Sequence, residues 1–283
     1  MRCDYVQHFR EHGYAVIRGA FGPGEVRELA RAFDRLYRAG LSHGTSYRDH
    51  NVFFRLAQDP ALGAIVRMLQ WPSYIDEVMA RYRIDRRIQR ILAPLLGDDL
   101  KQIINQMHWK PPGAANVEFG YHQDIRSRRP RSAYRAPARS YVQTGIAVDP
   151  HRPDNGAMTV LPGSHRLGEL KFGSDEPVME RPLDDADLRA LGLDPSDKID
   201  LVLEPGDLAL WHLYLVHGSG ANTSTDDRRF LINGYVIAEN CDRGEWAFRN
   251  GEPCPLGEPV LVHYEELYTR PGAPAPDSAP PRC

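Results

Sequence analysis

Eight short segments rich in β-branched and aromatic residues follow one another from residue 101 onward, separated by turns that contain Gly, Pro or Asp. We predict strands at residues 101–110, 117–121, 140–148, 157–161, 199–203, 207–211, 228–238 and 259–263. One insertion, at 184–198, has the pattern of a helix followed by a loop. Strands at this spacing, with no helix between most neighbours, favour an antiparallel sandwich or barrel over alternating β-α-β units.

The residues before this region have mainly helical spacing. A short strand is predicted around residues 14–17, and a helix from Glu25 to Gly40 with Gly40 as its C-terminal cap. A second helical block runs from about Asp59 to Leu96 and divides into two helices near Asp85. We expect the apolar faces of these helices to buttress one sheet. The predicted fold is therefore mainly β with N-terminal helices.

Residues 1–270 are expected to form a single domain, followed by a Pro- and Ala-rich tail at 271–283 that lacks apolar periodicity and is not expected to be ordered. The formal net charge of −3 suggests neither nucleic acid nor a membrane surface as a partner. We find no apolar segment typical of a secretory signal or of a membrane span. The four cysteines lie near the chain ends in no metal-binding spacing and are interpreted as free thiols, so a cytoplasmic location is expected. The oligomeric state is not predicted.

His122 and Asp124 are two residues apart at the end of a predicted strand, so their side chains are expected on one face while Gln123 points away. His217, far along the chain, would complete a set of two imidazoles and one carboxylate. That set suits non-haem Fe(II) with coordination positions left open, which a 2-oxoacid and dioxygen could take. His-x-Asp alone also fits a surface strand with a solvated Asp. The presence of His217 and of the small-residue turn 218–220 later in the chain favours the metal site over this alternative.

Other polar residues could line the same pocket. Gln106, His108 and Lys110 share one face of a predicted strand, and we expect them to contact cosubstrate or substrate. Gln143, on the predicted strand 140–148, is expected to face the barrel interior and to make a polar contact with the cosubstrate.

Arg228 and Arg229 begin a predicted strand and point in opposite directions. A guanidinium pairs well with a carboxylate in bidentate fashion, so the inward-pointing arginine could hold the distal carboxylate of 2-oxoglutarate. The other arginine is expected to be an exposed charge at the strand end.

The order of several short motifs resembles that of the phytanoyl-CoA dioxygenase family, which includes ectoine hydroxylase and many bacterial natural-product oxygenases. These motifs are the opening segment 13–19, Lys110-Pro111-Pro112-Gly113, His122-Gln123-Asp124, Asn155-Gly156, Leu161-Pro162-Gly163-Ser164-His165, Pro205-Gly206-Asp207 and His217-Gly218-Ser219-Gly220, followed by Asn222 and Arg228. The resemblance covers nearly the whole chain.

The resemblance implies a double-stranded β-helix, or jelly roll, with Fe(II) bound by His122, Asp124 and His217. It also implies that Arg228 binds 2-oxoglutarate and that O2 is consumed. Halogenases of the same group have a small residue in place of the carboxylate, so Asp124 argues against halogenation.

The segment 126–139 departs from the family pattern, since it contains six arginines and no acid. Because it follows the predicted ligands directly, we expect a loop over the site in which Arg126, Arg128 and Arg139 contact an anionic or polyhydroxylated substrate. A solvated, partly mobile loop is the alternative.

The predicted reaction is oxidation of an unactivated C–H bond of a small molecule, anionic or glycosidic, in bacterial natural-product metabolism. Hydroxylation is the default, and oxidative cyclisation of a sugar-containing substrate is a second outcome. The alternatives are a cupin-type enzyme that does not use 2-oxoglutarate and a non-catalytic jelly roll that only binds a ligand.

Overall fold

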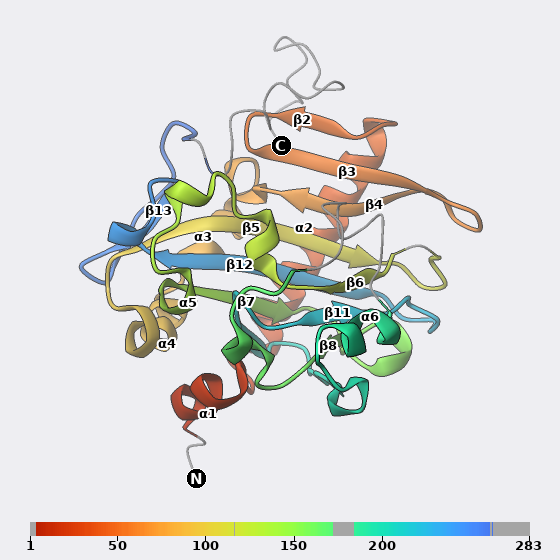
Figure 1. Ribbon diagram of the computed structural model, residues 1–283. Helices are drawn as coiled ribbons and strands as arrows, with labels where there is room; N and C mark the ends of the chain where they lie inside the picture. The colour runs from red at the N-terminus through yellow and green to blue at the C-terminus, as the bar shows by residue number, and fades with distance from the viewer. Residues whose placement is uncertain (1–3, 116, 172–183, 261, 263–283) are drawn as a thin grey trace.

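Two antiparallel sheets make up the body of the protein in the computed structural model, which describes residues 4–115, 117–171, 184–260 and 262 (Figure 1). The larger sheet has the strand order β1 (Tyr14–Ile17), β10 (Leu208–His212), β7 (Tyr141–Ala147), β12 (Arg228–Ile237), β5 (Leu100–Lys110), β4 (Gly63–Gln70), β3 (Val52–Asp59) and β2 (Tyr47–Asp49), with β13 (Glu245–Arg249) paired to β5 and β14 (Glu252–Pro253) to β13. The smaller sheet has the order β6 (Phe119–His122), β11 (His217–Ser219), β8 (Met158–Val160) and β9 (Ile199–Asp200). This arrangement confirms the predicted jelly roll.

Helices cover the outer face of the larger sheet (Figure 1). They are α1 (Tyr5–His12), α2 (Pro23–Ser42), α3 (Glu77–Arg83) and α4 (Arg86–Leu96), while α5 (Pro137–Ser140) and α6 (Asp185–Ala190) lie in later connections. Asp76 and Asp85 cap α3 and α4, because each carboxylate accepts backbone N–H groups of the first helical turn. Apolar residues of α2, α3 and α4 pack on the sheet in one continuous core, as the helical buttress predicts.

Strand β5 lies between this core and the interior of the jelly roll, and its successive side chains point alternately to the two sides. Met107 and Trp109 are buried in the helix-facing core. Gln106 and His108 face the other way and line a pocket between the sheets. The period of two seen in the sequence therefore places polar groups inside the barrel.

The predicted helical block at 59–96 is wrong in its first part. Residues 52–59 and 63–70 form the hairpin of β3 and β4, and a short 3-10 helix follows at Pro72–Tyr74. Within this block α-helices begin only at Glu77, and the break at Asp85 is confirmed. The apolar spacing of Ile65, Val66 and Leu69 also fits a helix, but β4 is buried on both faces, so it reads as a nearly continuous apolar run.

Gly40 is not a C-terminal cap, because α2 continues to Ser42. A Cβ atom at Gly40 would lie 2.7 Å from Val66 Cγ2 and 2.8 Å from Phe54 Cδ1, so the missing side chain lets α2 approach the β3–β4 hairpin closely.

Several other elements differ from the sequence-based expectations. Helix α1 and strands β2, β3 and β11 were not expected. The predicted strand 259–263 is not formed at its described residues 259, 260 and 262; Val262 is instead buried in a small core beside β5 and β7. The insertion 184–198 contains a short helix, as predicted.

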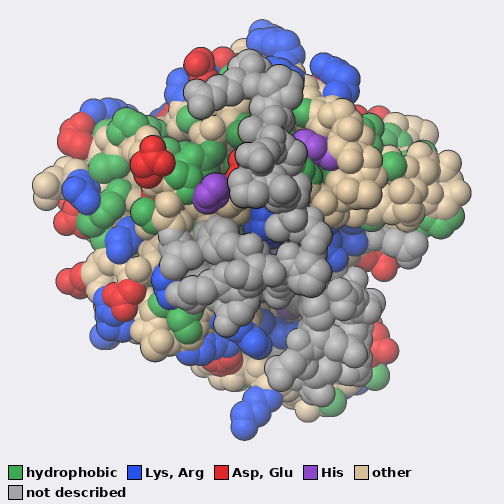
Figure 2. Space-filling model, turned by 90° about the horizontal axis from the view of Figure 1, so that it is seen from above, with side chains coloured by type: hydrophobic (Ala, Val, Ile, Leu, Met, Phe, Trp, Pro, Cys, Tyr) green, Lys and Arg blue, Asp and Glu red, His purple; other side chains and the backbone are tan. Residues whose placement is uncertain are grey.

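Within the described residues, no helix is long and apolar enough to cross a membrane. Cys241 and Cys254 are free thiols, while Cys3, Cys283 and the predicted flexible tail 271–283 lie outside the described residues. Figure 2 shows acidic and basic side chains interspersed around one face of the molecule.

Candidate metal centre and substrate pocket

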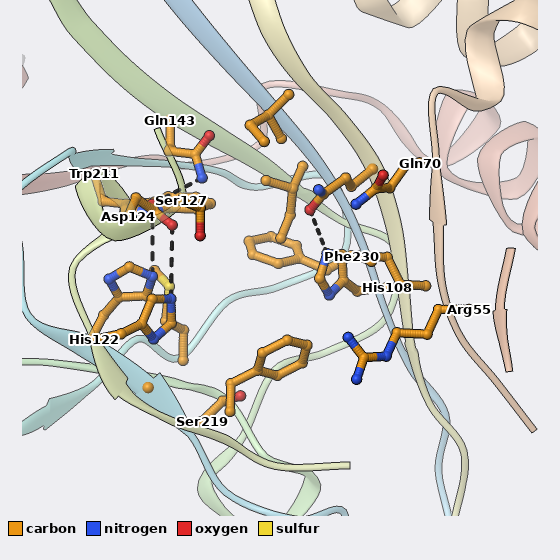
Figure 3. A pocket seen from close by; sticks show the side chains of 18 of the residues that line it. Arg55, Gln70, His108, His122, Asp124, Ser127, Gln143, Trp211, Ser219 and Phe230 are labelled. Carbon is orange, nitrogen blue, oxygen red and sulfur yellow. Dashed lines mark hydrogen bonds and ion pairs between the residues drawn. The ribbon is translucent and has the colours of Figure 1, made fainter. Parts of the chain in front are cut away.

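Three side chains from two paired strands and a turn converge on one point. His122 ends β6, His217 begins β11, and the two residues are direct partners in the antiparallel ladder. Asp124 Oδ1 lies 3.7 Å from His122 Nε2, and Asp124 Oδ2 lies 3.9 Å from His217 Nε2. One ligand atom from each of the three residues lies within 4.8 Å of the others, so this set could hold a metal ion (Figure 3).

Asp124 reaches this point by a different route from the one predicted. Strand β6 ends at His122, and Asp124 is the first residue of a 3-10 turn over 124–127. The turn, rather than strand alternation, directs the carboxylate toward the imidazoles. Gln123 does point away, as expected, and its amide donates to the carbonyls of Gly168 and Tyr214.

The two imidazoles are oriented by their own strands. His122 Nδ1 lies 2.8 Å from the Gly120 carbonyl oxygen, and His217 Nδ1 lies 2.9 Å from the Leu215 carbonyl oxygen. A carbonyl oxygen only accepts, so each Nδ1 carries the proton and each Nε2 presents a lone pair. In a neutral imidazole this tautomer leaves Nε2 available to bind a metal.

A chain of buried hydrogen bonds supports the Asp124 carboxylate. Asp124 Oδ2 accepts from Gln143 Nε2 and from Trp211 Nε1, each at 2.9 Å. Tyr141 Oη donates to Gln143 Oε1 at 2.6 Å and accepts from Arg128 Nη2 at 2.9 Å. These groups hold the carboxylate in place from the side opposite the imidazoles, as Figure 3 shows for Gln143 and Trp211.

The electrostatics favour the protonation states that metal binding needs. Burial raises the pKa of Asp124, but the nearby His217 and His122 and the charge of Arg128 outweigh it, so this pKa lies below its ordinary value. Burial, and then the neighbouring His217, lowers the pKa of His122 to about 4. The cluster therefore favours an ionised carboxylate and a neutral imidazole.

The cluster forms one wall of a pocket of about 340 Å³ between the two sheets. Figure 3 shows Asp124, His122 and Trp211 on one side of this pocket, and His108 and Arg55 on the other. The pocket is also lined by seven large apolar side chains: Phe53, Met68, Ile104, Phe119, Met158, Phe230 and Ile232. The volume is in the range of a small-molecule site.

Arg228 and Arg229 point to opposite faces of β12, as their alternation predicts. Arg229 points to the helix-covered face of the sheet and forms ion pairs with Asp149 and Asp34. Its side chain is only 13% exposed, so the prediction of an exposed charge at the strand end is wrong. Arg228 lines the pocket, is 3% exposed, and has no hydrogen bond or ion pair within the described part of the chain. Burial lowers the pKa of Arg228 to about 10, which still leaves the guanidinium charged at neutral pH. The Arg228 guanidinium lies 5.3 Å from the centre of the Phe230 ring. A buried cation that faces a cavity and forms no ion pair with a described residue suits an anionic ligand.

Lys110 and His108 lie near Arg228 but have different surroundings. Lys110 Nζ donates to Ser219 Oγ at 2.7 Å and to the Gly220 carbonyl, so it ties β5 to the turn after His217. Burial, and then the charge of Arg228, holds the pKa of Lys110 well below its ordinary value. His108 Nε2 lies 2.9 Å from Gln106 Oε1, and burial followed by nearby Arg228 lowers the pKa of His108 to about 3.

The arginine-rich segment is largely tied to the protein itself. Of the three predicted lid residues Arg126, Arg128 and Arg139, Arg128 lines the pocket. Its side chain is buried and donates a hydrogen bond to the Tyr141 hydroxyl. Arg139 is exposed and lines a separate cavity beside α1 and α4, and Arg126 is not among the residues that line the main pocket. Arg135 pairs with Asp242. Among the described residues of this segment, Arg128 is the arginine that lines the pocket, and the role of the segment as a lid stays a prediction.

Sequence reasoning missed several residues of the site. Trp211 contacts Asp124, and the register of β10 against β7 places it directly opposite Gln143. Arg48 and Arg55 line the pocket from β2 and β3, which were not predicted as strands. The turn residues Asp59 to Gly63 were the available signal for that hairpin.

Comparison with known proteins agrees with this geometry. Residues 9–230 match the profile of the phytanoyl-CoA dioxygenase (PhyH) family. The chain belongs to this family. A probable alpha-ketoglutarate-dependent hypophosphite dioxygenase of Stutzerimonas stutzeri is 25% identical over 246 residues, which cover 84% of this chain and 80% of the relative. The peroxisomal phytanoyl-CoA dioxygenase of Bos taurus is 25% identical over 240 residues, with 82% and 67% covered.

Solved structures of other proteins share the fold. The epimerase SnoN from nogalamycin biosynthesis superposes with a TM-score of 0.63 at 23% identity, covering 96% of this chain and 93% of SnoN. EctD from S. alaskensis, solved with 2-oxoglutarate and 5-hydroxyectoine, has a TM-score of 0.66 at 24% identity, with 94% and 87% covered. At these identities the likeness supports the fold alone.

Proposed function

We propose that this protein is an Fe(II)- and 2-oxoglutarate-dependent oxygenase that oxidises an unactivated C–H bond of a small molecule. The observation that carries the proposal is the convergence of His122, Asp124 and His217 on the wall of a pocket that also contains the buried cation Arg228. Membership of a dioxygenase family, and a relative named as alpha-ketoglutarate-dependent, support the same chemistry.

The side chains of His122, Asp124 and His217 suit Fe(II). Two imidazole nitrogens and one carboxylate oxygen leave coordination positions open for 2-oxoglutarate and dioxygen. Iron bound there, with 2-oxoglutarate as the co-reductant, supplies the oxygen activation that breaks the C–H bond. Over the whole hydroxylation, one oxygen atom enters succinate, the other enters the alcohol, and carbon dioxide is released.

The side chains have separable tasks in this scheme. His122 and His217 present Nε2 because their Nδ1 atoms are held by backbone carbonyls. Arg228 would bind the distal carboxylate of 2-oxoglutarate. We assign Gln143 to positioning Asp124 rather than to cosubstrate binding, because its amide already bridges Asp124 and Tyr141. Gln106 lines the pocket and is a candidate for a polar contact with 2-oxoglutarate.

The apolar residues of the pocket would help to determine which C–H bond of the substrate reacts. Phe230, Ile232 and Met68 are among the apolar residues that line the pocket. Such a surface excludes water and holds a hydrocarbon segment in one orientation, and the position of that segment decides which hydrogen is removed.

Natural-product metabolism is the proposed setting. Proteins with this fold include SnoN from nogalamycin biosynthesis and AviO1 from Streptomyces viridochromogenes. Hydroxylation is the simplest outcome, and oxidative cyclisation of a sugar-containing substrate is the second.

The test uses the wild-type protein supplied with Fe(II), 2-oxoglutarate and O2. Candidate metabolites are screened for those that stimulate succinate formation, and the products are examined by mass spectrometry for a gain of one oxygen atom or a loss of two hydrogens. A cupin-type enzyme that does not use 2-oxoglutarate, or a protein that only binds ligand, would form no succinate. The absence of succinate from fully loaded enzyme under every condition would refute the proposal.

Arg228 and its neighbour Arg229 provide a test variant and a matched control for the proposed role of Arg228 in 2-oxoglutarate binding. Arg228→Gln should weaken 2-oxoglutarate binding about 10- to 100-fold, because a charge-assisted hydrogen bond contributes roughly 1.5–3 kcal/mol. Arg229→Gln changes the same residue type on the opposite face of β12 and should leave the affinity unchanged. Calorimetry under anaerobic conditions measures both, with circular dichroism as the check on folding. Equal affinities in the two variants would contradict the assignment of Arg228.

A further inference from the structure

A row of uncharged polar side chains lies on the part of the pocket wall that β4 and β5 form. Gln70 on β4 is directly opposite Gln106 on β5 in the antiparallel register, and Met68 is opposite His108. Residues that are directly opposite in such a pair have their side chains on the same face of the sheet. All four line the pocket, and Figure 3 shows Gln70 and His108 on the side opposite Asp124. We call Gln70, Gln106 and His108 the β4–β5 polar row.

Much of the hydrogen-bonding capacity of the β4–β5 polar row is unused within the described part of the chain. His108 Nε2 lies 2.9 Å from Gln106 Oε1, and burial lowers the pKa of His108 to about 3, so the imidazole is neutral. Because Oε1 only accepts, Nε2 carries the proton and Nδ1 is left as an acceptor. The Gln106 amide nitrogen keeps both N–H donors, and the Gln70 carboxamide has no hydrogen bond to a described residue. The row therefore presents donors and acceptors together.

The β4–β5 polar row is separated from the arginine proposed to hold 2-oxoglutarate. Arg228 is opposite Lys110 in the β12–β5 ladder, whereas Gln106 is four residues before Lys110 on β5. At about 3.3 Å per residue, these two positions on β5 are roughly 13 Å apart. Gln70 is one strand further away, because the strand order is β12, β5, β4. Gln70 is thus placed to contact the substrate rather than the cosubstrate.

The surroundings of the row fit a neutral ligand. Arg48 and Arg55 also line the pocket, but each already interacts with other groups of the protein. The ring centres of His108 and Phe119 are 5.3 Å apart, so an apolar surface lies beside the row. An anion needs donors only, whereas hydroxyl groups use donors and acceptors alike. A few amide groups beside an aromatic ring are a common way to bind a small polar molecule.

We propose that Gln70 and Gln106 form a subsite for a neutral hydroxylated group, so that the substrate carries a sugar ring or a similar polyol. The hydroxyl groups bond to the two carboxamides, and the C–H bond that reacts lies on the part of the substrate nearer the metal cluster. Gln70 is then a residue that determines substrate specificity. The inference rests on the proposed function, because the metal cluster defines the reacting end of the pocket.

The test measures binding of three probes that share a phenoxy group on a six-membered ring. Phenyl β-D-glucopyranoside is neutral and hydroxylated, phenyl β-D-glucuronide is an anion, and 2-phenoxytetrahydropyran has no hydroxyl group. Each is titrated calorimetrically into anaerobic wild-type protein loaded with Fe(II) and 2-oxoglutarate. We expect the glucoside to bind about 10-fold or more tightly than 2-phenoxytetrahydropyran, because an analogue without hydroxyls leaves polar groups of the site unpaired. The glucuronide should bind no more tightly than the glucoside, since the row presents acceptors as well as donors.

Variants locate the subsite. Gln70→Leu and Gln106→Leu should each weaken glucoside binding about 3- to 10-fold, because each removes a neutral hydrogen bond. Gln70→Leu should also leave the affinity for 2-oxoglutarate unchanged. Gln58→Leu changes the same residue type at an exposed position of β3 outside the pocket, so it is the matched control and should bind the glucoside as the wild type does. Circular dichroism checks the folding of all three variants.

The outcomes separate this inference from the proposed function. Failure of the wild type to bind Fe(II) or 2-oxoglutarate, measured first, refutes the proposed function. If both bind normally, the subsite is overturned by any of four results: no measurable glucoside binding, equal affinity for the glucoside and 2-phenoxytetrahydropyran, tighter binding of the glucuronide than of the glucoside, or unchanged glucoside affinity in both leucine variants of the row. Loss of 2-oxoglutarate affinity in Gln70→Leu would also overturn it, because Gln70 would then belong to the cosubstrate site.

Discussion

Replacing Tyr141 with Phe removes one hydroxyl group from the chain of hydrogen bonds behind the Asp124 carboxylate. That hydroxyl accepts from Arg128 and donates to Gln143, whose amide in turn donates to Asp124. The ring itself stays in place, so the change leaves packing nearly intact. Its effect should therefore report on the hydrogen bonds alone.

The structure sets the size of the effect. A neutral buried hydrogen bond contributes about 1 kcal/mol and one to a charged group roughly 1.5–3 kcal/mol, so the loss of both should cost about 3 kcal/mol of unfolding free energy. Without its donor, the Gln143 amide is no longer fixed in the orientation that serves Asp124. Loss of such support around a metal ligand lowers metal affinity by roughly 10- to 100-fold.

The assay pairs urea unfolding with metal titration against a competing chelator. Tyr134→Phe is the matched control, because Tyr134 is buried beside Tyr141 in the same small core but donates only to the Val262 carbonyl, at 3.3 Å. The control should lose about 1 kcal/mol of stability and keep its metal affinity. If both variants bind metal as tightly as the wild type, the hydrogen-bond chain does not position Asp124.

Three further perturbations test other parts of the structure. Gly145→Ala should destabilise the fold by about 1–3 kcal/mol in urea unfolding, because the new Cβ would lie 2.0 Å from the Phe230 ring, whereas Gly220→Ala meets no atom within 4 Å and serves as the control. The pKa of His108 is lowered to about 3 by burial, so the fold favours its neutral form and loses stability as pH falls below the unfolded value near 6.5. Between pH 7 and 5, His108→Gln should therefore lose about 2 kcal/mol less stability than the wild type, and equal losses would contradict the argument. Removing metal with EDTA should lower the unfolding midpoint of wild-type protein, by the equivalent of about 2.7 kcal/mol if metal was present at 100 times Kd, and should not change that of Asp124→Ala.

Alternation and local spacing account for what the sequence predicted well. Gln106 and His108 face the pocket while Met107 faces the helices, because a strand places alternate residues on opposite sides. Arg228 and Arg229 separate in the same way. These predictions required only that the segment is a strand and that its two faces have different surroundings.

Contacts between distant segments account for what was missed. Trp211 reaches Asp124 because β10 pairs with β7 in one particular register, which no local pattern specifies. The hairpin at 47–70 was hidden because β4 is buried on both faces and so lacks the alternation of a half-exposed strand. The run of arginines at 126–139 suggested a lid, but the partners of those arginines, such as Tyr141 and Asp242, are known only from the tertiary structure.

The β-hairpin that carries Arg55 joins the rest of the larger sheet through β4, which pairs with β5 over residues 68–70. The metal cluster is supplied by β6, β11 and the turn after β6, which belong to the other side of the pocket. Mutations of the pocket-lining residues of the hairpin, such as Arg55, can thus alter which molecules the pocket accepts while leaving the three metal-cluster residues in place. Because these two regions are separate, substitutions in the hairpin can change substrate specificity in small steps while the metal site stays intact.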